Sequence, residues 1–171
     1  MPDTLAGLPL HPLLVHATVV IVPLAAVTVL LAAVWPRFRR WAHFLPLALA
    51  VAGLILDPLS TSTGESLESQ VGHNALIEKH SQLADGLLPW LIVLVVAAAG
   101  LYAWHRRKTR RTATTSVARR TRSWIPIALS VLAVVASLGT TVQVVLIGHS
   151  GAQAAWSDVA ASSSAPRPSG H

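Results

Sequence analysis

The chain has 171 residues, of which 53% are apolar and 12% are charged, and it contains no cysteine. Such a composition is too apolar and too poor in charge for a soluble domain of this length, so it indicates a membrane protein. The formal charge of +6 does not indicate nucleic-acid binding, because the basic residues lie between apolar segments rather than among aromatic residues on a soluble face. The lack of cysteine excludes disulfides, iron–sulfur clusters and covalently attached haem in this sequence.

Two apolar segments in the first third of the chain predict membrane-spanning helices, since about 20 residues rising 1.5 Å each cross roughly 30 Å of hydrocarbon. The first covers residues 13–34 and carries no charge. The second covers residues 41–59, and it reaches spanning length only if it begins near Trp41 and continues past Asp57 and Pro58.

A short external helix is predicted next, within "ESLESQVGHNALIEKHSQLADGLL", where His73 and His80 share an apolar stripe at spacings of three, four and seven. The third and fourth spans follow at residues 87–104 and 124–148, both without charge. The predicted fold class is therefore an all-α membrane bundle of four helices in residues 1–156. The polar, small and proline-containing residues 157–171 predict a disordered external tail.

The charges predict the orientation of the bundle in the membrane. Eleven of the 13 basic residues follow the first and third spans, and all seven acidic residues fall toward the other side. By the positive-inside rule the basic side is cytoplasmic, which places both termini on the non-cytoplasmic side of the cell membrane. Tryptophans mark the predicted cytoplasmic boundary of all four spans, as interfacial aromatic rings do: Trp35, Trp41, Trp104 and Trp124.

Three histidines are predicted to lie at one depth. His11 precedes Trp35 by 24 residues, His80 precedes Trp104 by 24, and His149 follows Trp124 by 25. In continuous helices each would lie about 36 Å from its tryptophan, at the outer interface. His16 and Asp57 would lie slightly deeper, at roughly 28 Å and 24 Å. A polar group in this position is expected to face the bundle interior, because turning it to lipid is costly.

Three stretches give the sequence a family resemblance. "LPLHPLLVHATVVIVPLA", "TSTGESLE" followed by "LIEKHSQLAD", and "VVLIGHSGAQAAW" resemble the four-helix integral membrane proteins grouped as domain of unknown function 2231. The resemblance runs from Leu8 to Trp156 and implies no established activity. Some relatives are joined to Rieske-type iron–sulfur proteins, which implies a redox setting. The positions that the resemblance implies are worth attention are His11, His16, Glu65, His80 and His149.

Neutral imidazoles on facing helices can hold a porphyrin or a metal ion. Without cysteine or an internal methionine, haem b would need two histidines from different spans, namely His16 with His149 or with His80. The other possibility is copper or zinc, with Asp57 or Glu65 as a further ligand or as an orienting partner of the histidines His11, His80 and His149. Either centre predicts electron transfer with a redox partner protein.

Another hypothesis is a structural or assembly subunit whose histidines only satisfy local hydrogen bonds. No catalytic motif is found, so enzyme activity is unsupported. Membrane lipid is the expected partner, together with a redox protein or a second copy of the chain. The basic run "HRRKTRRTATTSVARRTR" fits both a topology determinant and a contact with anionic lipid, and topology is favoured because the positive-inside rule alone accounts for it.

Overall fold

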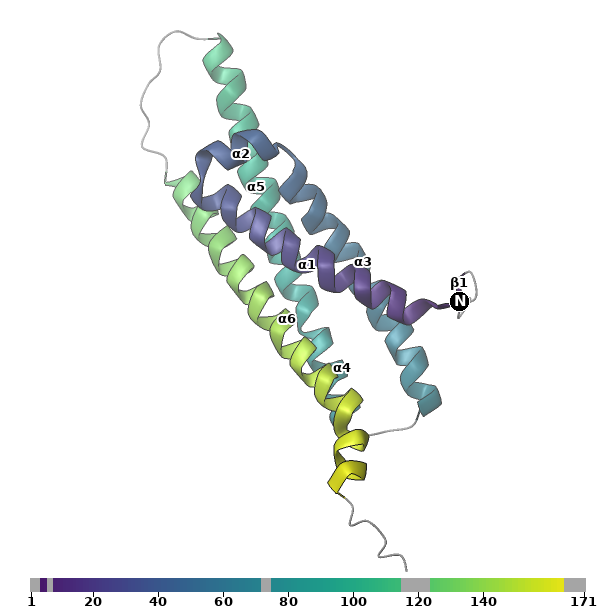
Figure 1. Ribbon diagram of the computed structural model, residues 1–171. Helices are drawn as coiled ribbons and strands as arrows, with labels where there is room; N and C mark the ends of the chain where they lie inside the picture. The colour runs from purple at the N-terminus through teal and green to yellow at the C-terminus, as the bar shows by residue number, and fades with distance from the viewer. Residues whose placement is uncertain (1–3, 6–7, 72–74, 115–123, 165–171) are drawn as a thin grey trace, which may run out of the picture.

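The chain forms long helices, and a computed structural model describes residues 4–5, 8–71, 75–114 and 124–164 (Figure 1). Two short strands, β1 (Thr4–Leu5) and β2 (Leu8–Pro9), pair antiparallel before the first helix. The helices are α1 (Leu10–Val34), α2 (Pro36–Ala42), α3 (Leu45–Val71), α4 (Ala75–Asp85), α5 (Leu87–Thr114) and α6 (Ile125–Ser164). The predicted all-α fold class is confirmed.

Within the described residues, four helical stretches are long and apolar enough to cross a membrane. They are Pro12–Val34, Leu45–Ser66, Ala75–Thr109 and Ile125–Ala154. Large apolar side chains on the outside of the bundle are exposed, for example those of Val135, Val142 and Val145 on α6. A continuous apolar exterior suits hydrocarbon rather than water. The chain is therefore a multi-pass membrane protein.

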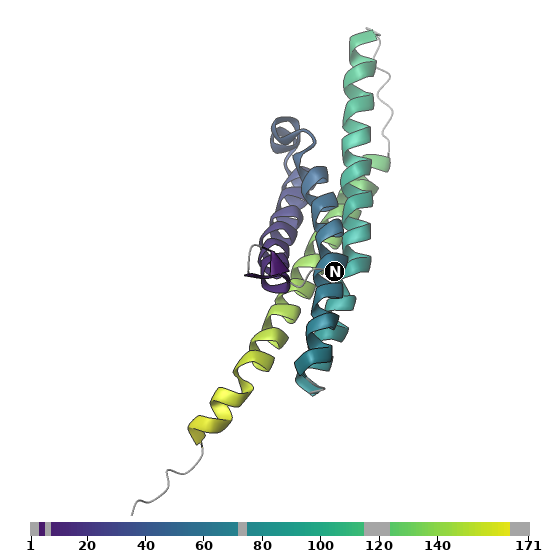
Figure 2. The ribbon, with the colours of Figure 1, turned by 90° about the vertical axis from the view of Figure 1, so that its right-hand side faces the viewer.

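The spanning helices pack in the cyclic order α1, α3, α5, α6, so each lies between two neighbours (Figure 1). At opposite ends of the bundle, α5 and α6 extend past the other helices (Figure 2). Small side chains occupy much of the core and allow the helices to approach closely, as is usual in membrane bundles. The buried alanines include Ala25, Ala33, Ala50, Ala97, Ala98, Ala133 and Ala136.

The short helix α2 separates the first two spans. Pro36 stands at its N-terminus, and a residue before proline is biased to extended backbone, so α1 ends at Val34 and Trp35 is extended (φ −119°). Arg39 then reaches back to the end of α1, where its Nε donates to the carbonyl of Ala32 (2.5 Å) and its Nη2 to that of Ala33 (2.9 Å). These bonds satisfy carbonyl groups that the helix leaves without a partner. Burial lowers the pKa of the Arg39 guanidinium from its usual value.

The second span and the predicted external helix differ from the prediction in their bounds. Trp41 belongs to α2, and the second span begins only at Leu45, because His43 takes a positive φ of 47° that interrupts the helix. The helix α3 continues to Val71, so it includes the first part of the predicted external helix. The later part of the predicted external helix corresponds to α4, and His73 lies outside the described residues.

The two ends of the chain are more helical than predicted. The first helix begins at Leu10, three residues before the predicted span, so His11 lies in its first turn. The last helix continues to Ser164, so residues 157–164 are helical where the composition predicts disorder. The rest of the predicted tail, residues 165–171, lies outside the described part of the chain.

Candidate functional site

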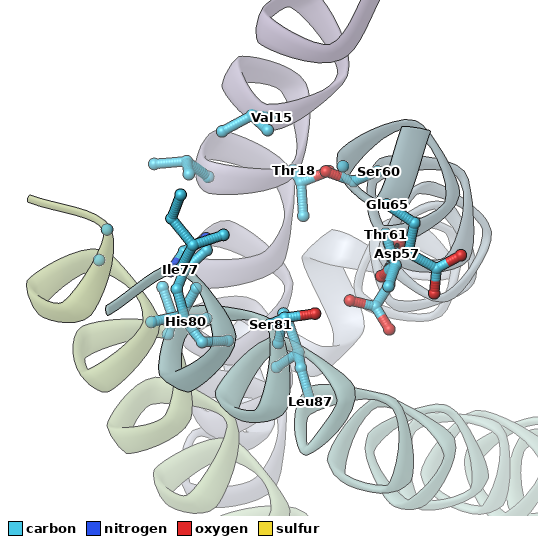
Figure 3. A pocket seen from close by; sticks show the side chains of 17 residues that line it. Val15, Thr18, Asp57, Ser60, Thr61, Glu65, Ile77, His80, Ser81 and Leu87 are labelled. Atoms are coloured by element: carbon cyan, nitrogen blue, oxygen red, sulfur yellow. Dashed lines mark hydrogen bonds between the residues drawn. The ribbon is translucent and has the colours of Figure 1, made fainter. Parts of the chain in front are cut away.

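A cavity of about 490 Å³ lies among α1, α3, α4 and α6, at the end of the bundle that carries the acidic residues (Figure 3). We call it the His80 cavity. Its lining consists of Val15, Thr18 and Val19 of α1, Asp57, Ser60, Thr61, Gly64 and Glu65 of α3, Ile77, His80, Ser81 and Ala84 of α4, Leu87 of α5, and Val144, Ile147, Gly148 and Gly151 of α6.

The wall formed by α4 and α6 holds His80 in one orientation. The ring packs over Gly151, where an added Cβ would lie 3.1 Å from Cε1. Its Nδ1 lies 3.0 Å from Oγ of the buried Ser150, and that hydroxyl donates its only hydrogen to the Ile147 carbonyl (2.9 Å). With the hydroxyl hydrogen on the Ile147 carbonyl, Nδ1 is the donor to Ser150, and in that tautomer of the neutral ring Nε2 keeps a free lone pair.

The opposite wall, on α3, carries two carboxylates. Asp57 is only 5% exposed, whereas Glu65 is exposed at the rim. Figure 3 shows both side chains projecting from α3, with Asp57 directed toward α4 and the start of α5. Among the described residues, no side chain hydrogen-bonds or ion-pairs with the Asp57 carboxylate, and the hydroxyl of Thr61 donates to the Asp57 backbone carbonyl instead (2.9 Å). The cavity thus contains a buried carboxylate without a described counter-charge.

A hydrogen bond between helices positions the short helix that carries His80. Gln143 of α6 donates from Nε2 to the backbone carbonyl of Leu83 near the end of α4, at 2.6 Å. Since the last carbonyls of a helix have no partner within it, this bond fixes α4 against α6. It acts together with the His80–Ser150 contact two turns further along α6.

The comparison with protein families agrees with this architecture. Residues 7–164 match the family described as predicted membrane protein (DUF2231). The chain belongs to the DUF2231 family. No match was found among curated proteins or among solved structures. Membership confirms the resemblance seen in the sequence, and it assigns this DUF2231 protein to the membrane without assigning an activity.

The structure places the predicted ligands of this DUF2231 protein in different surroundings. His80, Asp57 and Glu65 line the cavity. His16 is exposed, and its Nδ1 donates to the Pro12 carbonyl one turn earlier (2.6 Å). His149 is also exposed, because consecutive helical residues are about 100° apart and its neighbour Ser150 faces inward. The side chain of His11 is outside what the structure describes.

The described residues of this DUF2231 protein form no metal site, because no three or more of their His, Asp or Glu side chains lie close enough together to hold an ion. As a porphyrin site, the cavity offers one imidazole rather than two among the side chains that the structure describes. The haem and metal hypotheses stay predictions. The cavity lining can accept hydrogen bonds or a positive charge through His80 and the carboxylates of α3, and its apolar side chains can enclose an apolar group.

Sequence reasoning on this DUF2231 protein missed the partners that position His80. Ser150 lies in the "GHSGA" motif, in which only its neighbour His149 was predicted to be a ligand. A glutamine within an apolar span, such as Gln143, indicates a contact between helices, but its acceptor, a backbone carbonyl of α4, is not visible in a sequence. The available signal was the inward stripe of the α4 segment, which correctly predicts that His80 faces the bundle.

Proposed function

We propose that this protein binds a small amphipathic molecule in the His80 cavity, with the apolar body of the ligand against α1 and α6 and a cationic or hydrogen-bond-donating head toward α3. The observation that carries the proposal is the cavity. Its volume of about 490 Å³ falls in the range of roughly 300–1,000 Å³ that is typical of small-molecule sites. Like such sites, it combines mostly apolar walls with a few polar groups.

The polar groups favour a positively charged head. A buried carboxylate is unfavourable unless a counter-charge or several hydrogen bonds compensate for its lost hydration. Asp57 has neither among the described residues, so an ammonium group in the cavity would supply what is missing. The Nε2 lone pair of His80 adds a second acceptor on the other wall. An anionic head would meet two carboxylates and no cation of the cavity lining.

Three probes with the same tail test the charge of the head. The detergent-purified full chain is heated with octylammonium, octanol or octanoate, and the midpoint of unfolding is measured. We expect octylammonium to raise the midpoint most, because a ligand that binds only the folded state stabilises it. Asp57→Asn should remove that preference. Glu78→Gln, which removes one charge from an exposed position on α4, should keep it.

The outcome also decides between binding and the structural hypothesis. If all three probes shift the midpoint equally, or if Asp57→Asn behaves like Glu78→Gln, the binding proposal is wrong. A structural or assembly subunit of a membrane complex would then be the better description. A cavity-filling substitution gives an independent check, since Gly148→Leu adds a side chain where no atom lies within 4 Å of the Cβ position. It should weaken binding of octylammonium without unfolding the protein.

Haem b ligated by His80 is the second candidate function. It is supported by the Nε2 lone pair and by Gly148 and Gly151, whose lack of side chains allows a flat ligand to approach the backbone. Oxidised and reduced absorption spectra, with elemental analysis for iron, copper and zinc, test this function on protein from metal-supplied cells. His80→Ala should remove any bound haem or metal, and His149→Ala should leave it in place. A colourless, metal-free protein would refute this candidate and with it the electron-transfer role.

The orientation is also a proposal, supported by the separation of basic and acidic residues: the basic end faces the cytoplasm and both termini face outward. Because the chain has no cysteine of its own, single cysteines test it directly. A membrane-impermeant maleimide should label Gln153→Cys on intact cells and Arg37→Cys only after permeabilisation. The reverse pattern would invert the orientation.

A further inference from the structure

The end of the bundle opposite the His80 cavity carries cations without acids. Residues of α2, of α5 and of the start of α6 line one cleft at this end. The basic residues of this end include Arg37, Arg39, Arg40, Arg106, Arg107 and Lys108, while every acidic residue of the chain lies before Thr4, from Asp57 to Asp85, or at Asp158. The net charge of this end is therefore positive, and these cations repel one another.

A cleft of about 410 Å³ brings part of this charge together. Its lining combines three cationic side chains, Arg39, Arg40 and Lys108, with the ring of His105. Trp104 and Pro126 supply apolar surface to the same cleft.

The three cations differ in what they can offer a ligand. Arg39 already donates to the carbonyls at the end of α1, so it contributes mainly its charge. Arg40 is an exposed guanidinium, which presents several N–H donors in a fork that fits phosphate oxygens. Lys108 is an exposed ammonium on the neighbouring helix. Two helices thus present donors to the same cleft, where a phosphate group could accept hydrogen bonds from both.

The position of the cleft relative to the membrane favours one source of phosphate. It lies where the candidate span Ile125–Ala154 begins and close to where Pro12–Val34 ends, so hydrocarbon adjoins it. A tryptophan in its wall is typical of the headgroup level. We propose that this cleft binds the phosphate of an anionic phospholipid headgroup, with Arg40 and Lys108 as the direct donors and Arg39 as a nearby charge. The proposal is independent of the His80 cavity.

The test compares two double variants that lose the same charge from the same two helices. Arg40→Gln with Lys108→Gln alters the cleft, whereas Arg37→Gln with Arg107→Gln alters exposed residues that do not line it. The full chain in detergent is titrated with dihexanoyl phosphatidylglycerol and with dihexanoyl phosphatidylcholine, and bound lipid is counted by native mass spectrometry. We expect wild type and control to prefer phosphatidylglycerol. The cleft variant should bind it about 30-fold more weakly, since each basic side chain at an anionic surface contributes about fivefold.

Three results would overturn the proposal. The first is equal weakening in both double variants, which would reduce the effect to the general charge of this end. The second is unchanged binding in the cleft variant. The third is full competition by an equal concentration of inorganic phosphate, which would make the cleft a site for the free ion rather than for lipid. Circular dichroism of each variant, all at exposed positions, checks that a loss of binding is not a loss of fold.

Discussion

The contact between α5 and α6 allows a prediction about stability from a single methyl group. The indole of Trp90 lies over Gly139, so that a Cβ added at Gly139 would lie 2.2 Å from Cζ3 and 2.3 Å from Cε3 of the ring. Ordinary contacts of a Cβ begin near 3.4 Å. In Gly139→Ala the ring or the helix must therefore move by more than an ångström, and overpacking of this kind costs about 1–3 kcal/mol.

Alanine also has a favourable effect that must be separated from the clash. It is about 0.8–1 kcal/mol better than glycine inside a helix. Gly148→Ala, on the same helix, receives this benefit without the clash, because no atom lies within 4 Å of its Cβ position. We therefore expect Gly148→Ala to be neutral or slightly stabilising. Gly139→Ala should be less stable than Gly148→Ala by about 1–3 kcal/mol, the cost of overpacking alone.

The free energy of unfolding is measured by titrating sodium dodecyl sulfate into mixed micelles and following helix content by circular dichroism. Equal stabilities of Gly139→Ala and Gly148→Ala would refute the packing of Trp90 on Gly139. A double-mutant cycle sharpens the test, since removing the indole by Trp90→Leu should bring the effect of Gly139→Ala close to that of Gly148→Ala. An unchanged cost in that background would mean that the strain arises elsewhere.

Three further substitutions test the contacts that shape the two ends of the bundle. Ser150→Ala removes the hydroxyl beside Nδ1 of His80 and should cost about 1 kcal/mol in unfolding free energy, with weaker octylammonium binding in the same thermal assay. Gln143→Leu leaves the Leu83 carbonyl without its donor and should lower the free energy of unfolding by about 0.6 kcal/mol, the average for such bonds in membranes. Amide hydrogen exchange in α4 should become faster, and unchanged exchange would contradict the role of this bond. Arg39→Gln removes a charged donor from the carbonyls at the end of α1 and should lower the free energy of unfolding by about 1.5–3 kcal/mol. A smaller loss than that caused by replacing an exposed arginine would show that water satisfies these carbonyls instead.

The spans could be predicted because length and lack of charge suffice to identify them. The direction that each residue faces could not, because α1 and α6 are apolar on every side and periodicity then gives no preferred face. His16 and His149 show the consequence: both were predicted to face the bundle interior, but both side chains are exposed. In α4, polar and apolar residues alternate with helical period, and there the inward position of His80 was predicted.

The rest of the site depends on contacts between distant parts of the chain. The bond from Gln143 to Leu83 and the bond between His80 and Ser150 join residues 60 and 70 positions apart. No local pattern determines which of several hydroxyls or amides meets a given acceptor. The position of α2 also depends on a contact outside the helix itself. The chain breaks between α2 and α3 at His43, and Arg39 of α2 donates to the Ala32 carbonyl at the end of α1. The proline of α2 was visible in the sequence, but the destination of its arginine was not.

The length of α6 has a practical consequence outside the membrane. Its 40 residues extend for about 60 Å, roughly twice the thickness of the hydrocarbon layer. The apolar candidate span ends at Ala154, so the helix continues beyond it for about 15 Å to Ser164. A reporter or affinity tag fused directly after Ser164 would therefore begin outside the apolar span, away from the hydrocarbon of a detergent micelle.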